Sequence, residues 1–186
     1  MVNREADVER ARVIYHKGTN RSAFLLGQVD KYSWQDTGSS FGLSDVLAAY
    51  LYGQLEQRAS VLARRRHVFD RYHAALAPVA TRLGLTLPDV PADRVQAFHM
   101  FYVLLPDVDT RNRVLASMVA QDIHATFHYV PLHSSPHGRR VAAREVACPV
   151  TDDISGRLLR LPFYTGLSDA DVDRVLAAFL GALAAG

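Results

Sequence analysis

The stretch Leu158-Leu159-Arg160-Leu161-Pro162 decides the fold class, because it has the pattern of a short strand and ends at a proline. The stretch Ser168-Asp169-Ala170-Asp171 follows and opens a helix, with serine at the N-cap and Asp171 in the capping-box position. Apolar residues then recur at the spacing of one helix face, namely Val172, Val175, Leu176, Phe179, Leu180 and Leu183. A strand followed by an amphipathic helix predicts a sheet with helices packed on it.

Two more strand patterns precede this one. Residues 96–105 and residues 125–130 are rich in aromatic and β-branched side chains, and each run stops at a proline. Asp107 or Asp109 can cap a helix between them, and residues 134–150 have the composition of a loop. The predicted order of this part of the chain is β-α-β-(α)-β-α, so we expect an α/β (α+β) domain with a three-stranded sheet.

The N-terminal part of the chain combines helical and loop patterns. Residues 4–15 predict a short helix, and residues 18–43 read as a long loop. A loop longer than about 15 residues inside a compact domain is usually functional or held by a partner. Residues 45–77 predict one long helix or two helices in tandem, ending near Pro78.

A change of hydrophobic period near residues 78–91 marks the best candidate for a domain boundary. It divides the chain into residues 1–80, with a loop and a long interdomain helix, and residues 81–186, a small α/β domain.

The composition predicts a globular protein. The chain has 186 residues, of which 49% are hydrophobic, and its net charge is +2. This charge gives no case for binding nucleic acid or an anionic membrane. Cys148 is the single cysteine, so neither an intramolecular disulfide nor a cysteine-based zinc site can form. The sequence has no signal-peptide or membrane-span pattern, and we expect a cytoplasmic location.

Four histidines lie close together in sequence, at His124, His128, His133 and His137. Their spacing invites a zinc interpretation, but the last two lie beyond the proline that ends the strand, so the four do not share one helix face. Hydrogen bonding or proton transfer by imidazole is the better interpretation, and a strand-edge histidine bonded to backbone is an equal alternative. We expect no metal site.

Two further short segments could either bind a ligand or have a purely structural role. Residues 18–22, Gly-Thr-Asn-Arg-Ser, have the composition of an anion-binding loop, although an ordinary turn explains them as well. Residues 64–66 are three consecutive arginines in a predicted helix, where they cannot all meet one partner. A solvated helix face is the default there, and nucleic-acid binding is the weaker alternative.

Several stretches of the chain resemble one enzyme family. They are residues 16–22, 29–34, 38–45, 128–133 and 157–163. On these residues the chain resembles the DegT/DnrJ/EryC1/StrS sugar-nucleotide aminotransferases, and among them the dTDP-4-oxo-6-deoxy-D-glucose transaminase type. The resemblance runs nearly from end to end.

The resemblance implies a fold-type-I enzyme that depends on pyridoxal 5′-phosphate (PLP). Such an enzyme moves an amino group from glutamate to a nucleotide-linked 4-keto-6-deoxy sugar, in amino-sugar biosynthesis for lipopolysaccharide, another cell-surface polysaccharide or a glycosylated metabolite. Residues 1–80 would be the end of its large domain and residues 81–186 its small domain, so the chain resembles the C-terminal half.

The family's PLP lysine lies upstream of residue 1, and neither Lys17 nor Lys31 matches it. We therefore expect no PLP bound covalently to this chain, no catalytic residue within it, and no activity of the chain alone. The partner would be a second copy in a homodimer or an N-terminal half. The alternative is a non-catalytic assembly module, or a split half that complements a separate N-terminal chain.

The resemblance also implies site residues. Three are implied for binding the cofactor of a neighbouring subunit, namely Asn20, Ser39 and Ser40. Six are implied for binding the nucleotide sugar, namely Arg21, Tyr32, Trp34, His128, Tyr129 and His133.

Overall fold

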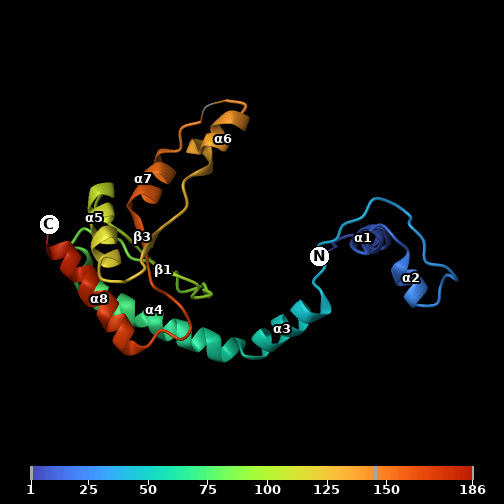
Figure 1. The fold of residues 1–186 in the computed structure, drawn as a ribbon, viewed down its shortest axis with the longest axis horizontal. Coiled ribbons are helices and arrows are strands. Elements are labelled where there is room, and N and C mark those ends of the chain that lie inside the picture. The colour runs from blue at the N-terminus through green and yellow to red at the C-terminus, as the bar shows by residue number, and fades with distance from the viewer. Residues whose placement is uncertain (1, 145, 186) are drawn as a thin grey trace. The chain divides into compact units, whose positions relative to one another are not determined.

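The computed structural model describes residues 2–144 and 146–185, which divide into two compact units, residues 1–56 and residues 57–186 (Figure 1). The predicted boundary between residues 80 and 81 refers to the domains of an intact enzyme and stays a prediction. No helix in the described part of the chain has the length and apolar character that a membrane span requires.

Unit 1 consists of the 3-10 helix η1 (Glu5–Asp7) and the helices α1 (Val8–Tyr15), α2 (Arg21–Leu25) and α3 (Asp45–Glu56). The predicted helix over residues 4–15 is confirmed. The prediction of an unbroken loop over residues 18–43 is wrong at α2. This helix has only five residues, which is too short for a helical hydrophobic period to be recognised in the sequence. The N–H of Phe24 donates to the carbonyl of Asn20 at 3.0 Å.

Unit 2 holds a longer series of elements. In chain order they are α4 (Arg58–Ala80), β1 (Phe101–Leu104), α5 (Val108–Val119), β2 (Thr126–Phe127), η2 (Leu132–Ser134), α6 (Pro136–Val141), α7 (Pro149–Arg157), β3 (Leu158–Leu161) and α8 (Asp169–Ala184). The predicted α/β class with a three-stranded sheet is confirmed.

Four sequence-based boundaries need correction, and the first is that β1 is shorter than the strand predicted over residues 96–105. Residues 45–77 were predicted as one long helix or two in tandem, and the structure has two, α3 and α4. Helix α4 continues past Pro78 to Ala80. Pro78 lies in the last turn of α4, so its missing N–H removes only one hydrogen bond near the end of the helix. The second strand is shorter than predicted, at Thr126–Phe127. The predicted loop over residues 134–150 contains α6, because Ser135 accepts a capping bond from the N–H of Gly138.

The strand that is last in sequence is central in the sheet. The order is β1-β3-β2, and β3 is antiparallel to both neighbours, with Val103 opposite Leu159 and Tyr102 opposite Arg160. Because side chains alternate along a strand, one face carries the fully buried Val103 and Leu159. The opposite face carries Tyr102 and Arg160.

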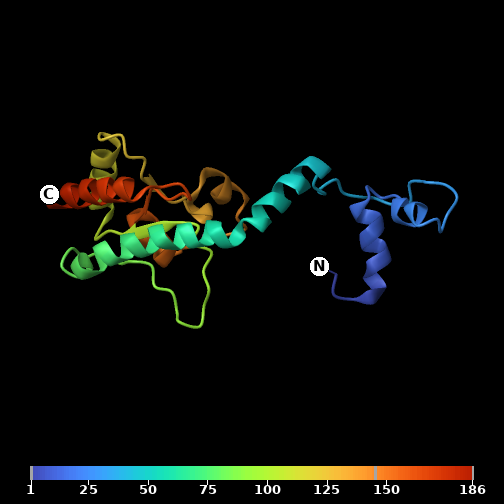
Figure 2. The same ribbon diagram turned by 90° about the horizontal axis from the view of Figure 1, so that it is seen from below.

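Helices α4, α5 and α8 supply most of the remaining core, and Figure 2 shows α8 lying alongside α4 although the two are far apart in sequence. Their largest fully buried side chains are Val68, Tyr72, Leu76, Val114, Met118, Val172 and Phe179. At the start of α8 the N–H of Asp171 donates to the Oγ of Ser168 at 3.1 Å, which confirms the predicted cap.

Tyr72 joins α4 to the end of the central strand. Its side chain is fully buried, and its hydroxyl donates to the carbonyl of Pro162 at 2.9 Å. Burial raises the pKa of this phenol, with smaller contributions from Tyr164 and Asp171, so the hydroxyl stays protonated in the folded state.

We expect Tyr72→Phe to lower the free energy of unfolding by about 1–3 kcal/mol, because it leaves the Pro162 carbonyl without its donor. Urea unfolding monitored by circular dichroism measures this change. Tyr164→Phe, at a half-exposed ring, is the matched control and should stay within about 0.5 kcal/mol of wild type. Equal effects of the two variants would contradict the assignment.

Arg157 ties the end of α7 to the end of β1. Its guanidinium donates to both carboxylate oxygens of Asp153, at 2.9 and 2.7 Å, and to the carbonyl of Leu105 at 2.9 Å. The hydrogen bonds from Arg157 hold the pKa of the Asp153 carboxyl below its usual range. Because the folded-state pKa is the lower one, this stabilisation is present above the unfolded value of about 3.9 and is lost as pH falls through the folded value.

We therefore expect wild type to be more stable than Asp153→Asn at about pH 7, and this difference to shrink as pH falls below the unfolded value of about 3.9 and through the lower folded-state pKa, because protonated Asp153 resembles asparagine. Urea midpoints of the two proteins across that range measure it. A difference that is constant or grows toward acid would show that Asp153 is not held in its charged form.

Candidate functional site

In unit 1 the chain after α1 closes on itself at two glycines. The carbonyl of Gly18, a residue with φ of 78°, accepts hydrogen bonds from the N–H groups of Gln35 at 2.7 Å and Asp36 at 3.0 Å. A Cβ on Gly18 would lie 1.7 Å from the carbonyl oxygen of Asp36, and a Cβ on Gly38 would lie 1.9 Å from the backbone nitrogen of Gly18. Only glycine tolerates this approach, so Gly18 and Gly38 close the loop between them.

Asn20, predicted to bind the cofactor, holds the same loop. Its Nδ2 donates to the carbonyl of Lys31 at 3.0 Å, and its Oδ1 accepts from the N–H of Ser33 at 2.7 Å. Both ends of the amide are therefore engaged with backbone.

The two predicted serines differ in their surroundings. The Oγ of Ser39 donates to the carbonyl of Ile14 at 3.2 Å, so its proton is committed to α1. Ser40 is exposed, and its hydroxyl has no hydrogen bond to any other described residue. Of the two, Ser40 has the hydroxyl that remains available to a ligand.

The three other predicted residues of unit 1 lie at its surface. Arg21 is exposed at the start of α2. The ring of Tyr32 is half-exposed, with its centre 6.3 Å from that of Phe24. Trp34 is 79% exposed, and its indole N–H donates to the carbonyl of Asp36 at 2.7 Å.

In unit 2 the structure brings His128 and Tyr129 next to Arg160. The two predicted residues follow β2 directly, and Arg160 of β3 lies opposite Thr126 of β2. The guanidinium carbon of Arg160 lies 5.9 Å from the centre of the Tyr129 ring, within cation–π range. The His128 ring meets the Tyr129 ring edge-on at 5.3 Å. We refer to His128, Tyr129 and Arg160 as the Arg160 cluster.

Two nitrogens of the Arg160 cluster are buried without a partner among the described residues. They are the Nδ1 of His128 and the Nε of Arg160. Buried polar groups are nearly always hydrogen-bonded, and one left without a partner is destabilising. The Nδ1 of His128 therefore has no backbone partner among the described residues, which differs from the backbone-bonded histidine of the strand-edge interpretation.

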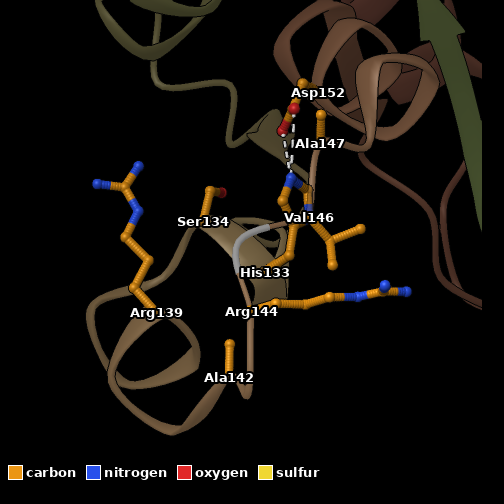
Figure 3. A pocket seen from close by; sticks show the side chains of 8 residues that line it. All are labelled: His133, Ser134, Arg139, Ala142, Arg144, Val146, Ala147 and Asp152. Atoms are coloured by element: carbon orange, nitrogen blue, oxygen red, sulfur yellow. Dashed lines mark hydrogen bonds and ion pairs between the residues drawn. The ribbon is translucent and has the colours of Figure 1, made fainter.

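His133, the third predicted residue of unit 2, pairs with Asp152. Its Nε2 lies 3.0 Å from one carboxylate oxygen of Asp152 and 3.2 Å from the other (Figure 3). The pair lines a pocket of about 800 Å³ whose walls come from η2, α6 and the chain that leads into α7. Arg139 and Arg144 also line this pocket, and in Figure 3 their side chains extend to opposite sides of Ala142.

The four clustered histidines do not converge. His124 is exposed beside Asp122 and the Nδ1 of His137 lies 2.7 Å from a nitrogen of Arg140, while His128 and His133 have the surroundings given above. Among residues 2–144 and 146–185, no group of three or more His, Cys, Asp or Glu side chains is placed to hold a metal ion.

Comparison with known proteins identifies the family. Residues 1–180 match the model of the DegT/DnrJ/EryC1/StrS aminotransferase family. The chain belongs to this family. Its members are PLP-dependent aminotransferases, and solved sugar aminotransferases share its fold.

Three solved structures illustrate this similarity. The aminotransferase TlmJ from Streptoalloteichus hindustanus is 26% identical, with a TM-score of 0.79 over 95% of this chain and 44% of that one. DesV from S. venezuelae is 26% identical, with a TM-score of 0.78 over 96% and 45%. Spr1654 from Streptococcus pneumoniae, in its PMP form, is 18% identical, with a TM-score of 0.78 over 99% of this chain and 46% of that one. The chain spans less than half the length of each.

The residues present fit PLP only in a supporting role. A lysine that holds PLP covalently needs an activating environment, such as an apolar pocket or a neighbouring cation. Lys17 and Lys31, the only lysines of the chain, are both exposed. The Ser40 hydroxyl can donate to a phosphate group, whereas the side chains of Asn20 and Ser39 already serve their own loop.

Sequence reasoning missed three residues of these sites. A signal for Arg160 existed, since it is the one charged residue in the apolar strand Leu158–Leu161. For Gly38 the signal was the glycine itself, because a glycine in a loop can mark a close approach between two backbone segments. For Asp152 there was no local signal, because its pairing with His133 spans 19 residues.

We expect Gly38→Ala to open the unit 1 loop, because the added Cβ would overlap the Gly18 backbone. Hydrogen exchange at the Gln35, Asp36 and Ser39 amides, which are bonded in wild type, should become markedly faster. Gly53→Ala in α3 is the matched control, since a Cβ there meets nothing within 4 Å. Unchanged protection in Gly38→Ala would show that the loop does not depend on this contact.

Proposed function

We propose that this chain is the C-terminal part of a PLP-dependent transaminase that acts on a nucleotide-linked 4-keto-6-deoxy sugar, with glutamate as amino donor. The match to the aminotransferase family over residues 1–180 supports the reaction class. The single observation that carries the proposal within this chain is the Arg160 cluster, in which the exposed phenol of Tyr129 lies next to both a guanidinium and an imidazole. The pathway would be amino-sugar biosynthesis for a cell-surface polysaccharide or a glycosylated metabolite.

The Arg160 cluster has the chemistry that a sugar substrate requires. Tyr129 is 76% exposed, so its hydroxyl can donate to or accept from a sugar hydroxyl. Arg160 and His128 both contact the Tyr129 ring, and such contacts reduce the conformational freedom that is lost when substrate binds. We assign Tyr129 and His128 to substrate binding and Arg160 to positioning Tyr129.

Unit 1 would contribute from across a subunit interface. PLP, when bound, supplies the electron sink that transamination needs. Ser40 would donate to its phosphate, Asn20 and Ser39 would hold the loop that presents Ser40, and Arg21, Tyr32 and Trp34 would contact substrate. The Schiff-base lysine would come from another polypeptide segment, because Lys17 and Lys31 are both exposed and neither lies in an apolar pocket.

A second candidate is an assembly module or split half without activity of its own. The apolar side chains of α3 favour it, since this helix leaves large side chains exposed at Val46, Leu47, Tyr50, Leu51, Tyr52 and Leu55. A monomeric soluble protein rarely leaves a patch of this kind uncovered. A second copy of the chain or a lysine-bearing N-terminal half would cover it.

The test is an amino-transfer assay with PLP, glutamate and a dTDP-4-keto-6-deoxy sugar, read by mass spectrometry of the nucleotide sugar. We expect no product from the chain alone and no borohydride-trapped PLP on Lys17 or Lys31. With a lysine-bearing N-terminal part supplied, we expect product. The proposal would be overturned if the chain alone formed product, or if the assembled enzyme transferred no amino group to any nucleotide sugar tested.

In the assembled enzyme, Arg160→Gln should lower kcat/KM for the sugar nucleotide by about tenfold, which corresponds to about 1.4 kcal/mol. Arg160→Lys keeps the charge and should recover part of this loss. Arg82→Gln, at an exposed position, is the control and should leave kcat/KM unchanged. If Arg160→Gln and Arg82→Gln changed kcat/KM equally, Arg160 would have no specific role in substrate binding.

A further inference from the structure

The loop that leads into β1 leaves the body of unit 2 and returns to it, and Figure 2 shows it projecting from the domain in light green. Its base is closed where Thr86 and Leu104 exchange backbone hydrogen bonds at 3.0 and 2.9 Å. We propose that residues 91–97 form a strap that opens when Arg65 of α4 releases Phe98, whose backbone it holds in a strained conformation. The proposal does not depend on the function proposed above.

The strain lies at Phe98. Its φ is 44°, in the left-handed region that glycine adopts readily and that a bulky side chain occupies only at a cost. Such a conformation persists only where the surrounding structure holds it, and it recurs in segments that switch between conformations. The centre of the Phe98 ring lies 5.5 Å from that of the buried Phe69 ring. The ring is thereby anchored beside the core, while the backbone is held from α4.

Arg65 of α4 holds the backbone of Phe98. Its Nη1 donates to the carbonyl of Phe98 at 3.1 Å and to that of His99 at 3.4 Å. Its Nε donates to the hydroxyl of Thr165 at 3.2 Å, and its guanidinium carbon lies 5.6 Å from the centre of the Phe163 ring. Because Thr165 and Phe163 follow β3, the end of the central strand fixes the Arg65 side chain. A planar guanidinium fixed in this way is a rigid donor, so it keeps both carbonyls directed toward α4.

Little else restrains the strap. Residues 91–97 are almost entirely exposed, and the side chain of Val95 is 99% exposed. In the described part of the chain, the one backbone–backbone hydrogen bond within the strap runs from the N–H of Arg94 to the carbonyl of Pro91, at 2.9 Å. Segments with few buried contacts and few hydrogen bonds open at a low free energy. Release of the Phe98 backbone therefore relieves strain and frees the strap in one step.

The test is limited trypsin digestion of the purified full chain, followed by mass spectrometry, because Arg94 places a cleavage site within the strap. The protease must draw this segment into its own cleft, which the anchor at Phe98 opposes. We expect Arg65→Gln to speed cleavage after Arg94 by about tenfold or more, because hydrogen bonds from a charged donor are lost. Hydrogen exchange at the Val175 and Phe179 amides of α8 should stay unchanged, which separates local opening from global unfolding.

Arg64→Gln is the matched control, since Arg64 precedes Arg65 on α4 and has no hydrogen bond to the strap in the part of the chain that the structure describes. It should leave the cleavage rate unchanged. Arg65→Lys keeps the charge but loses the planar fork of donors, so it should restore only part of the protection.

A second pair of variants tests the strain itself. Phe98→Gly and Phe98→Ala both remove the ring, and only glycine adopts a φ of 44° without a steric penalty. Glycine makes an unstrained loop more flexible, so at an ordinary position Phe98→Gly would be cleaved faster than Phe98→Ala. We expect the opposite order, with cleavage after Arg94 about threefold slower in Phe98→Gly.

The proposal would be overturned if Arg65→Gln left cleavage after Arg94 unchanged, or if Arg64→Gln accelerated it equally. It would also be overturned if Phe98→Ala were cleaved no faster than Phe98→Gly, because the backbone would then store no strain. Faster cleavage together with faster exchange in α8 would mean that Arg65 stabilises the whole of unit 2, which contradicts a local opening.

Discussion

β3 hydrogen-bonds to β1 along one edge and to β2 along the other, so the strand that comes last in sequence joins the whole sheet. Its Leu159 and Leu161 are buried on the core side, where α4, α5 and α8 cover them. A shift of one residue in its register would exchange these leucines with Arg160 and place a charge in the core. The apolar face therefore fixes the position of Arg160, and the Arg160 cluster follows from the packing of the sheet.

In unit 1, too, backbone packing determines which side chains are available to bind a ligand. The close approach of Gly18 and Gly38, with the amide bonds of Asn20, leaves little side-chain chemistry available for a ligand inside the loop. What the loop offers lies on its outside, as the exposed aromatic rings of Tyr32 and Trp34 and the hydroxyl of Ser40. A surface of this kind suits contact with another subunit better than it suits an enclosed pocket.

The sequence predicted the elements whose signals are local. The final helix was predictable because its cap and its apolar face lie within one stretch, and β3 because a proline ends a short apolar run. Helices α2 and α6 were missed because one or two turns show no period, and polar residues in them look like loop. The family could be recognised from its motifs, but the partners of His133 and Tyr129 come from positions far along the chain, and only the three-dimensional structure brings them together.

Helix α3 bears on how such a chain would persist inside a cell. Its exposed valine, leucine and tyrosine side chains form the kind of surface that chaperones and proteases recognise on unassembled subunits. A chain made in excess of whatever covers α3 would be removed, while an assembled chain would be spared. If a separate N-terminal half covers α3, as the second candidate function proposes, the amount of this protein would follow the supply of that half after synthesis.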